Sequence, residues 1–582
     1  MSQDARRGPD KDPGRVDPDG PATLGWRVRT LDPLTAVRRA GVAAPGPTTY
    51  VADRVLVRGV PADAADLSDL AEVAARRGWT IEVEPRDLRD LALLRQADLG
   101  REVLDGMVDA FAFGVRLAPA PGTATPLPDA WELVEELGGR SASAGAGLSL
   151  DHVLVAAPGP SIGGAPYTQP HPYTQPHPYT QPHPYTQPHP YTQPHPYTQP
   201  HPYEGIGEYG AAGSGGRAPV SWVGPRPARR HRAGEVPVRT AKGLDRPVVA
   251  VLDTGCGKHP WLGDDVVVRN PTVLGVPIGH YPTADLAVGD SEIGGMAGLP
   301  LVGGLDPAAG HGTFIAGLIH QGCPDALILS CRLYGSAGSI PEWDLLGSLR
   351  RLLLFHVLGL QSRSGYHPVD VLNLSLGYYH ERPQDEAFDQ PFARSLAALR
   401  RHGVVVVVSA GNDGDPRPLY PAAFAPKLDL TASPPVPVHP ESLVRHELPV
   451  LTVGALNPDG TTALFSNDGP WVTCLRPGAA VVSTLPTTLD GSMAASRGLA
   501  GMRPAERRAT IDPDGFGGGF GVWSGTSFAT PVLAGEIAAA LLARRESTPS
   551  PAPGGSWSDT VAARCTICWE AVAATTGLSP GS

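Results

Sequence analysis

The stretch Val248-Val249-Ala250-Val251-Leu252-Asp253-Thr254-Gly255 determines the fold that we expect for this 582-residue chain. The continuous apolar run from Val248 to Leu252 predicts a strand buried on both faces, as in a parallel sheet covered by helices. An aspartate at the carboxyl end of such a strand lies where open α/β sheets place their functional sites. We therefore expect an α/β domain with a site at Asp253.

Two further motifs supply a histidine and a serine, each at an expected helix start. After His311-Gly312-Thr313, the apolar residues Ile315, Leu318 and Ile319 recur at helical spacing. Gly525-Thr526-Ser527 precedes a segment rich in small residues, which allow close helix packing. Proline is tolerated in a helix only in the first turn, so we expect Pro531 to lie in that turn. Ser527 is then expected near a helix N-terminus, where the dipole favours negative charge.

In chain order the three motifs provide Asp253, His311 and Ser527, the residue types of an acyl-transfer site. A serine needs a base to become a nucleophile, and a buried carboxylate orients the histidine that acts as this base. Together the motifs resemble those of the subtilisin-like serine proteases (subtilases, peptidase family S8) over roughly residues 218–545. The resemblance implies a serine endopeptidase with an acyl-enzyme intermediate and a three-layer domain with a central parallel sheet.

The segment Ser409-Ala410-Gly411-Asn412 follows a second expected strand, Val404 to Val408. The resemblance implies that the Asn412 amide completes an oxyanion hole together with the backbone N–H of Ser527. From the residues alone, Asn412 before Asp-Gly is equally an ordinary turn asparagine, so both interpretations stay open at this point.

Substrate-binding residues are implied in the same way. The expected strand Val369 to Leu374 continues into Ser375, Leu376 and Gly377, and the resemblance makes this segment one wall of the S1 pocket and a partner of the substrate backbone. Ser409, Ala410 and Gly411 form the other wall. Pairing along a strand edge draws affinity from main-chain hydrogen bonds, so polypeptides are the expected substrates.

Composition and charge exclude several functions. The net charge of −11 argues against a nucleic-acid partner. No run of about 18 apolar residues exists, so we expect no membrane span. Residues Met1 to Gly20 are polar and lack the apolar core of a signal peptide, which predicts a cytoplasmic protein. Secretion remains the alternative if the start is misassigned or export is unconventional.

No cofactor and no metal ligands are assigned from the sequence. No dense Asp/Asn cluster with glycine predicts a calcium loop. Cys565 and Cys568 form a C-x-x-C pair without a second pair nearby, so we expect buried thiols rather than a zinc site. Cys256, close to Asp253, is interpreted as a small buried apolar residue rather than a catalytic one.

Four regions are expected along the chain. Residues 1–22 are expected to be disordered, and residues 23–158 to form a small α+β domain. Its predicted order, β-α-β-β-α-β with an inserted helix, is that of a ferredoxin-like fold, which subtilase propeptides share. This domain is therefore a candidate intramolecular inhibitor, with an unrelated accessory domain as the alternative. Residues 159–217 form a linker, and residues 218–582 the protease domain.

The linker contains Pro-Tyr-Thr-Gln-Pro-His six times from Pro166 to His201. Two prolines per repeat favour a polyproline II helix, in which the histidines recur every two turns, about 19 Å apart. One metal ion cannot bridge neighbours at that distance in an extended chain. We therefore interpret the repeat as a spacer, with metal capture as the alternative role of its histidines: His171, His177, His183, His189, His195 and His201.

Two function classes remain open, and the sequence argues against a third. The first is an active serine endopeptidase, and the second is a catalytically inactive subtilase-like domain that binds peptides or serves as a scaffold. The presence of Asp253, His311, Ser527 and Asn412 favours the first, because a binding module needs none of them. A dinucleotide-binding enzyme is disfavoured, since no G-x-G-x-x-G follows the first strand of the domain.

Overall fold

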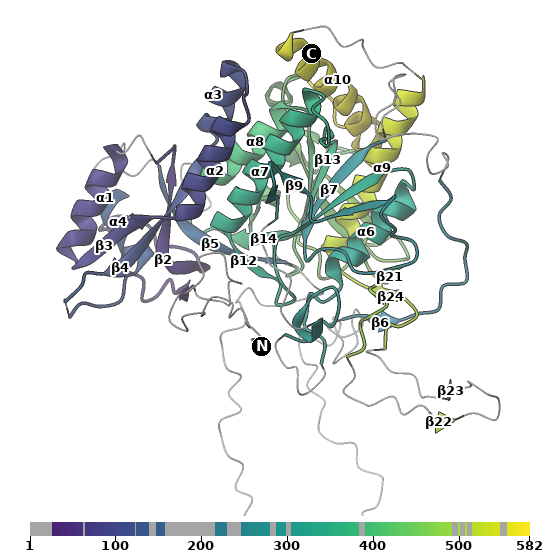
Figure 1. Cartoon of the computed structure of the whole chain (residues 1–582), viewed down its shortest axis with the longest axis horizontal. Helices are drawn as coiled ribbons and strands as arrows, with labels where there is room; N and C mark the ends of the chain where they lie inside the picture. Colours follow the sequence, from purple (N-terminus) through teal and green to yellow (C-terminus); the bar gives the residue numbers. More distant parts are fainter. Residues whose placement is uncertain are drawn as a thin grey trace, which may run out of the picture.

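The computed structural model of the chain describes most of the two folded regions expected from the sequence (Figure 1). The described residues are 26–61, 65–122, 124–138, 147–156, 216–229, 246–279, 287–297, 304–382, 390–491, 499–500, 507–508, 515–547 and 556–581. The expectations for residues 1–22 and for the repeat linker lie outside them, apart from residues 216 and 217.

A seven-stranded parallel sheet forms the centre of the C-terminal part, with the order β20-β19-β15-β13-β7-β11-β8. The expected apolar runs form adjacent strands of this sheet, β13, β7 and β15, because each can be buried on both faces. The strand bounds are β7 (Val248–Asp253), β8 (Val267–Arg269), β11 (Leu327–Arg332), β13 (Val371–Leu374), β15 (Val405–Ser409), β19 (Val450–Leu456) and β20 (Cys474–Pro477).

Helices cover both faces of this sheet, which gives the three-layer α/β arrangement expected from the sequence (Figure 1). Alternate residues of β7 divide between two hydrophobic clusters. Val248, Ala250 and Leu252 belong to the cluster that includes α7 and α8, whereas Val249 and Val251 belong to the one that includes α6, α9 and α10. The helix bounds are α6 (His311–Gly322), α7 (Glu342–Leu360), α8 (Gln390–Arg401), α9 (Thr526–Ser547) and α10 (Trp557–Thr576).

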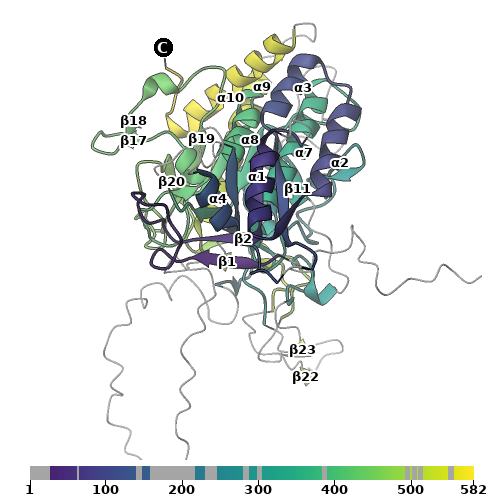
Figure 2. The same ribbon diagram turned by 90° about the vertical axis from the view of Figure 1, so that its left-hand side faces the viewer.

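The N-terminal part is built around an antiparallel sheet in the order β5-β2-β4-β3, with β1 paired to β2. Every strand and helix predicted there is present, and β1 and α3 are additional. Figure 2 shows α1 and α4 in front of this sheet. The bounds are β1 (Val28–Leu31), β2 (Thr48–Arg58), α1 (Ala65–Arg76), β3 (Trp79–Val83), α2 (Pro85–Gln96), α3 (Arg101–Asp109), β4 (Ala112–Pro119), α4 (Ala130–Gly138) and β5 (Leu148–Ala156).

The N-terminal sheet continues into the C-terminal part through its edge strand β5. β5 pairs antiparallel with β12 (Ser339–Pro341) and, at its last residues, with β14 (Leu376–Tyr379), which in turn pairs with β16 (Leu419–Tyr420). On the same side, α7 contacts β4 and β5, so one helix packs against both sheets (Figure 1). The two parts therefore share a core and a sheet.

Short elements complete the described chain. A three-stranded antiparallel sheet has the order β21-β24-β6, and the remaining strand pairs are small hairpins. Their bounds are β6 (Ala218–Pro219), β9 (Thr272–Val273), β10 (Val276–Pro277), β17 (Leu428–Asp429), β18 (Val436–Pro437), β21 (Val481–Thr484), β22 (Leu499–Ala500), β23 (Arg507–Arg508) and β24 (Phe520–Trp523), with single turns of 3-10 helix at Ala287–Gly289, Ala422–Phe424 and Pro440–Ser442.

Helix α9 is the one described helix that is long and apolar enough to cross a membrane by length and composition. In the fold it is instead a core helix, because 72% of its most apolar window is buried inside the protein. It packs against α6 and against β13, β15 and β19 of the central sheet. The apolar character of α9 is thus explained by its central position.

Candidate active site

The candidate catalytic residues gather at the carboxyl edge of the central sheet and at the starts of two helices. Asp253 is the last residue of β7, and Ser375 and Asn412 follow the adjacent strands β13 and β15. His311 is the first residue of α6, and Ser527 is the second residue of α9. Parallel strands bring these positions together because their carboxyl ends share one edge.

Asp253 holds His311 by two contacts. The Nδ1 atom of His311 lies 2.8 Å from Oδ1 and 3.0 Å from Oδ2 of Asp253. Tyr334 donates its hydroxyl to Oδ2 at 2.6 Å, and the backbone N–H of Thr254 donates to Oδ1 at 2.8 Å. Burial and the neighbouring Asp253 carboxylate keep the pKa of Tyr334 well above its usual value, so this residue stays a neutral donor. The carboxylate is thus fixed in orientation.

The imidazole of His311 is packed from the side of α9. The ring of Phe528, next to Ser527, lies with its centroid 5.3 Å from that of His311, and the Trp523 ring centroid lies at 5.6 Å. Because Nδ1 is engaged by Asp253, the chemistry available to the ring is at Nε2. This atom is buried and has no hydrogen-bond partner among the described residues.

Pro531 is not in the first turn of its helix, and this corrects the sequence-based expectation. α9 begins at Thr526, so Pro531 lies inside the helix. A proline has no N–H, and the carbonyl four residues earlier, that of Ser527, receives no helical hydrogen bond from it. The hydroxyl of Ser375 donates to this carbonyl at 3.1 Å. The hydrogen bond joins the helix that carries Ser527 to the segment that follows β13.

Asn412 is oriented by the residue before Ser527. Its Oδ1 atom accepts hydrogen bonds from both the N–H and the hydroxyl of Thr526, each at 2.8 Å. The side-chain amide therefore presents its oxygen to Thr526, and its NH₂ group points the other way. Asn412 is 1% exposed, which is the environment that a preorganised donor requires.

A second asparagine, Asn467, orders the loop around Asn412. Oδ1 of Asn467 accepts the backbone N–H groups of Asp413 and Asp415, both at 3.0 Å. Gly411 has a φ of 107°, and a Cβ atom there would lie 2.3 Å from Nδ2 of Asn467. Only glycine fits this position without strain, so Gly411 is a structural requirement of the loop.

The predicted substrate-binding segment is paired with a strand of the N-terminal part. Leu376 and Gly377 lie opposite Ala156 and Val155 of β5, and the N–H of Ala156 donates to the carbonyl of Gly338 at 2.6 Å. β5 thus lies between β12 and β14 and is hydrogen-bonded on both sides. Of the opposite predicted wall, Ser409 ends β15, and Ala410 and Gly411 follow it directly, all of them buried.

Glu292 is a buried acid that the sequence analysis did not single out. Its carboxylate accepts the hydroxyls of Thr254 and Thr313 and, at 3.2 Å, the backbone N–H of Gly257. Burial raises its pKa above the usual range, and the hydroxyls that it accepts oppose the shift. Thr254 follows Asp253 directly, so Glu292 ties the strand end to the first turn of α6. Its place in a Gly-rich loop far from both motifs gave no signal in the sequence.

The cysteines lie in the structure as buried or half-buried thiols. Cys256 is buried next to the site, and burial raises its pKa to about 12. Cys565 and Cys568, the C-x-x-C pair, lie on α10, where burial raises their pKa values to about 11 and about 12. Thiols with such pKa values are poor nucleophiles at neutral pH.

A model of the subtilase family matches residues 245–567, which is more than half of the chain. The chain belongs to the subtilase family. The matched segment of this subtilase contains Asp253, His311, Asn412 and Ser527, whereas the N-terminal sheet lies outside it.

Known relatives match about half of the length of this subtilase. It is 26% identical to the serine protease AprX of Bacillus subtilis over 344 residues, which cover 53% of this chain and 66% of AprX. It is 28% identical to mycosin-4 of Mycobacterium tuberculosis over 311 residues, which cover 51% of this chain and 55% of mycosin-4. The chain thus spans between about half and two thirds of the length of these relatives.

Among solved structures, fervidolysin from Fervidobacterium pennivorans aligns with 86% of this chain and 56% of its own, at 15% identity and a TM-score of 0.40.

Proposed function

We propose that this subtilase is a serine endopeptidase that hydrolyses peptide bonds through Asp253, His311 and Ser527. The observation that carries the proposal is the buried imidazole of His311. It is bound at Nδ1 by the carboxylate of Asp253 and packed by Phe528, the residue after Ser527. A carboxylate at Nδ1 leaves Nε2 as the base for a serine hydroxyl, which is the arrangement that acyl transfer requires.

The proposed reaction proceeds in two halves. Ser527 Oγ attacks the substrate carbonyl carbon while Nε2 of His311 takes the hydroxyl proton, and Asp253 stabilises the resulting imidazolium. The NH₂ group of Asn412 and the backbone N–H of Ser527 donate to the oxyanion. His311 then returns the proton to the leaving amine, which gives the acyl-enzyme. Water, deprotonated by His311, hydrolyses the ester and restores Ser527.

Polypeptides in an extended conformation are the proposed substrates. The pairing of β5 with both β12 and β14 supports this proposal, because it identifies two edges that accept an extended chain between them. Ser375, Leu376 and Gly377 would pair with the substrate backbone on one side. Recognition of this kind depends on main-chain hydrogen bonds and tolerates varied side chains.

Intramolecular inhibition by residues 23–158 follows from the same pairing. The sheet order β5-β2-β4-β3, with α1 and α4 in the two crossovers, supports the ferredoxin-like fold expected for this region. β5 lies in the place proposed for substrate, so substrate and β5 exclude each other. The repeat linker would keep the domain at a high effective concentration near the cleft after any release.

The decisive experiment replaces the nucleophile. Ser527→Ala is expected to abolish hydrolysis of a generic peptide and labelling by a fluorophosphonate probe, with an unchanged circular dichroism spectrum. His311→Ala and Asp253→Ala should also be severely impaired, and the Ser527/His311 double variant should be little worse than either single one, because the three residues act as a unit. Wild-type turnover by a folded Ser527→Ala chain would disprove the assignment. Because β5 lies in the place proposed for substrate in the full chain, absence of probe labelling in residues 218–582 alone would favour an inactive binding module.

A further inference from the structure

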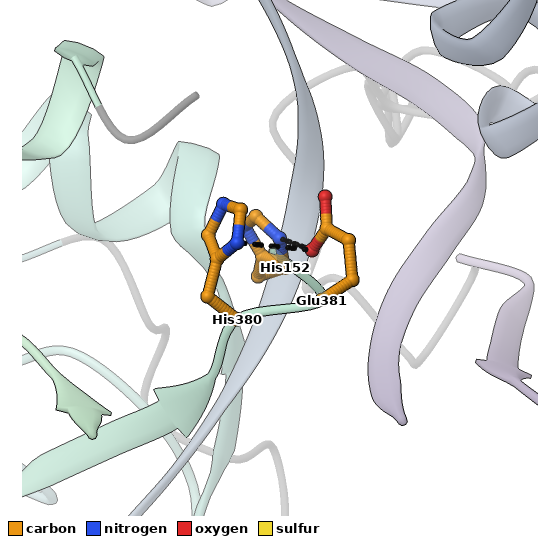
Figure 3. Close-up of side chains that lie close together, drawn as sticks. All are labelled: His152, His380 and Glu381. Carbon is orange, nitrogen blue, oxygen red and sulfur yellow. Dashed lines mark hydrogen bonds and ion pairs between the residues drawn. The ribbon is translucent and has the colours of Figure 1, made fainter. Parts of the chain in front are cut away.

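Two histidines and a glutamate meet at the junction between the N-terminal part and the protease domain (Figure 3). His152 lies in β5, and His380 and Glu381 follow β14. One donor atom from each residue lies within 4.8 Å of the other two, and all three residues are buried. This cluster is outside the proposed catalytic machinery, and none of its members was singled out in the sequence.

The distances within the cluster are close to those of a tetrahedral metal site. Nε2 of His152 lies 2.8 Å from Oε2 of Glu381, and Nδ1 of His380 lies 3.7 Å from the same oxygen. Donors bound to a tetrahedral zinc ion at about 2.0–2.1 Å are separated by about 3.3 Å. The two observed separations lie on either side of this value, so small side-chain shifts would produce the geometry.

Glu342 supplies the outer contact that metal-binding histidines usually have. Its Oε2 atom lies 2.8 Å from Nδ1 of His152, at the far side of the ring from Glu381. A carboxylate at this nitrogen fixes the tautomer in which Nδ1 carries the proton and Nε2 has a lone pair for a metal ion. Glu342 belongs to α7, so the protease domain holds both nitrogens of a histidine from the N-terminal part.

Charge and hydrogen bonding in the cluster also favour a cation. Without a metal ion, an imidazolium at His152 leaves a net charge of −1 between Glu342 and Glu381 if His380 is neutral, whereas a divalent ion with neutral histidines brings the sum to zero. Oε1 of Glu381 is buried without a hydrogen-bond partner among the described residues, so a cation next to this carboxylate would also stabilise an unsatisfied oxygen. The ion would displace two contacts, the 2.8 Å hydrogen bond between Nε2 of His152 and Oε2 of Glu381 and the 2.8 Å hydrogen bond from the Arg382 N–H to Nδ1 of His380.

We propose that His152, His380 and Glu381 bind one divalent transition-metal ion of the zinc class at this junction. Binding replaces the proton at Nε2 of His152 with a metal–nitrogen bond and releases that proton to solvent. The ion joins β5 to the segment after β14 and so fastens the N-terminal part to the protease domain. The effect of the ion on peptide hydrolysis rests on the proposed inhibition, whereas binding itself does not.

Binding is tested in the full chain carrying Ser527→Ala, with the six repeat histidines replaced by glutamine so that only the folded part can bind. Zn²⁺ is added to the metal-free protein, and bound metal is measured by equilibrium dialysis with elemental analysis. One ion per chain is expected. His152→Gln, His380→Gln and Glu381→Gln should each weaken binding by at least about 100-fold, and Glu342→Gln by about 10–100-fold. His439→Gln, at an exposed His–Glu pair, is the matched control and should have no effect.

Proton release provides an independent readout. The titratable groups that face His152 are Glu342 from α7, Glu381 and His380 after β14, and Tyr378 and Tyr50 from the neighbouring strands. The nitrogen that binds the ion must be unprotonated, so metal and proton compete for Nε2 of His152. Binding should therefore weaken as the pH falls, and calorimetry in buffers of different ionisation enthalpy should report the protons that are released.

If a chain with a ligand substitution fails to fold, the proposal can still be tested with the chain that keeps His152, His380 and Glu381 and lacks only the repeat histidines. Zn²⁺ should then raise the melting temperature in a saturable way. The proposal is overturned if no saturable binding occurs, or if binding survives all three ligand substitutions. In either case His152 is an imidazolium clamped between two carboxylates. Because every measurement uses an inactive chain, failure of the metal site is distinct from failure of the protease assignment.

Discussion

At the scale of single residues, the site depends on how each catalytic group is held by its neighbours. Asp253 receives hydrogen bonds from Tyr334 and Thr254, and Asn412 is aligned by Thr526. Tyr334 lies far from Asp253 in the sequence, whereas Thr254 and Thr526 stand next to catalytic residues in the motifs themselves. The hydrogen bonds of all three are visible only in the structure.

Asn412→Ala is expected to lower kcat by about 10²–10³-fold with KM nearly unchanged. The amide meets a negative charge that exists only in the transition state, so ground-state binding does not depend on it. Steady-state kinetics on a generic peptide measure both constants. Thr526→Val is the matched control, since it removes the hydroxyl that contacts Asn412 but keeps the amide in place. A rise in KM with an unchanged kcat would assign Asn412 to substrate binding instead.

Glu292→Ala is expected to lower the free energy of unfolding by about 3 kcal/mol, because it removes the buried acceptor of the Thr313 hydroxyl and one of the two acceptors of both the Thr254 hydroxyl and the Gly257 N–H. Urea unfolding of the Ser527→Ala chain measures this loss. Glu292→Gln keeps an acceptor and should cost less. An equal loss in both variants would show that the carboxylate does not act through these hydrogen bonds.

The same residue gives a pH dependence with a defined sign. Burial raises the pKa of Glu292 in the folded state, so the folded chain holds this proton more tightly than the unfolded chain. The contribution of this bound proton to the free energy of unfolding is therefore largest at low pH. It is lost as the pH rises from the usual glutamate pKa through the raised pKa of Glu292. Glu292→Gln has no such proton. As the pH rises through this range, the free energy of unfolding of the Glu292→Gln chain should increase relative to that of the parent chain.

At the scale of elements, the start of α9 is joined to the segment after β13 through an irregularity of the helix. Pro531 donates no hydrogen bond to the Ser527 carbonyl, and Ser375 donates one from outside the helix. The nucleophile and the predicted substrate-binding segment are thereby connected. In a regular helix, the N–H of residue 531 would donate a hydrogen bond to the Ser527 carbonyl.

A double-mutant cycle tests this connection. Ser375→Ala is expected to destabilise the protein by about 1 kcal/mol, since a buried hydrogen bond is lost. In a Pro531→Ala background the loss should be smaller, because the N–H of residue 531 can then donate to the Ser527 carbonyl as in a regular helix. Chemical unfolding of the four chains gives the coupling energy. Additive effects would show that Ser375 and Pro531 act independently.

At the scale of the whole molecule, buried ion pairs join the N-terminal part to the protease domain. Asp90 of α2 accepts hydrogen bonds from Arg350 and Arg351 of α7 at 2.9 Å each, and all three residues are buried. Burial opposes charge on Asp90, yet the two arginines hold its pKa below the usual range. Loss of Asp90 removes the carboxylate that compensates the buried charge of Arg351, which costs about 3–5 kcal/mol, whereas Arg350 keeps Asp87 as a partner at 2.8 Å.

Asp90→Ala is therefore expected to loosen the N-terminal part and, under the proposed inhibition, to raise peptide hydrolysis by the full chain by about 10²-fold or more. The substitution leaves the protease domain itself unchanged. Asp105→Ala, which removes the partner of Arg101 in an exposed i,i+4 pair, is the control and should leave the rate unchanged. Equal rates for wild type, Asp90→Ala and Asp105→Ala would argue for an accessory domain rather than an inhibitor.

The sequence by itself determined three adjacent strands of the central sheet, β7, β13 and β15, the starts of α6 and α9, and the residues proposed for catalysis. Long apolar runs and short motifs at strand and helix ends are local signals, so they can be recognised without the fold. The strands and helices predicted for residues 23–158 were recognised from local signals of the same kind. Pro531 shows the limit of a local rule, because a hydroxyl from another element provides the hydrogen bond that the helix loses.

Only the tertiary structure decided which distant residues meet. Glu292 reaches Thr254 and Thr313, Asp90 reaches two arginines of α7, and His152 lies between two glutamates of another part of the chain. Each of these contacts depends on side-chain packing across elements rather than on a pattern along one element. The insertion of β5 between β12 and β14 is of the same kind, because an edge strand carries no sequence signal for the strand that will pair with it.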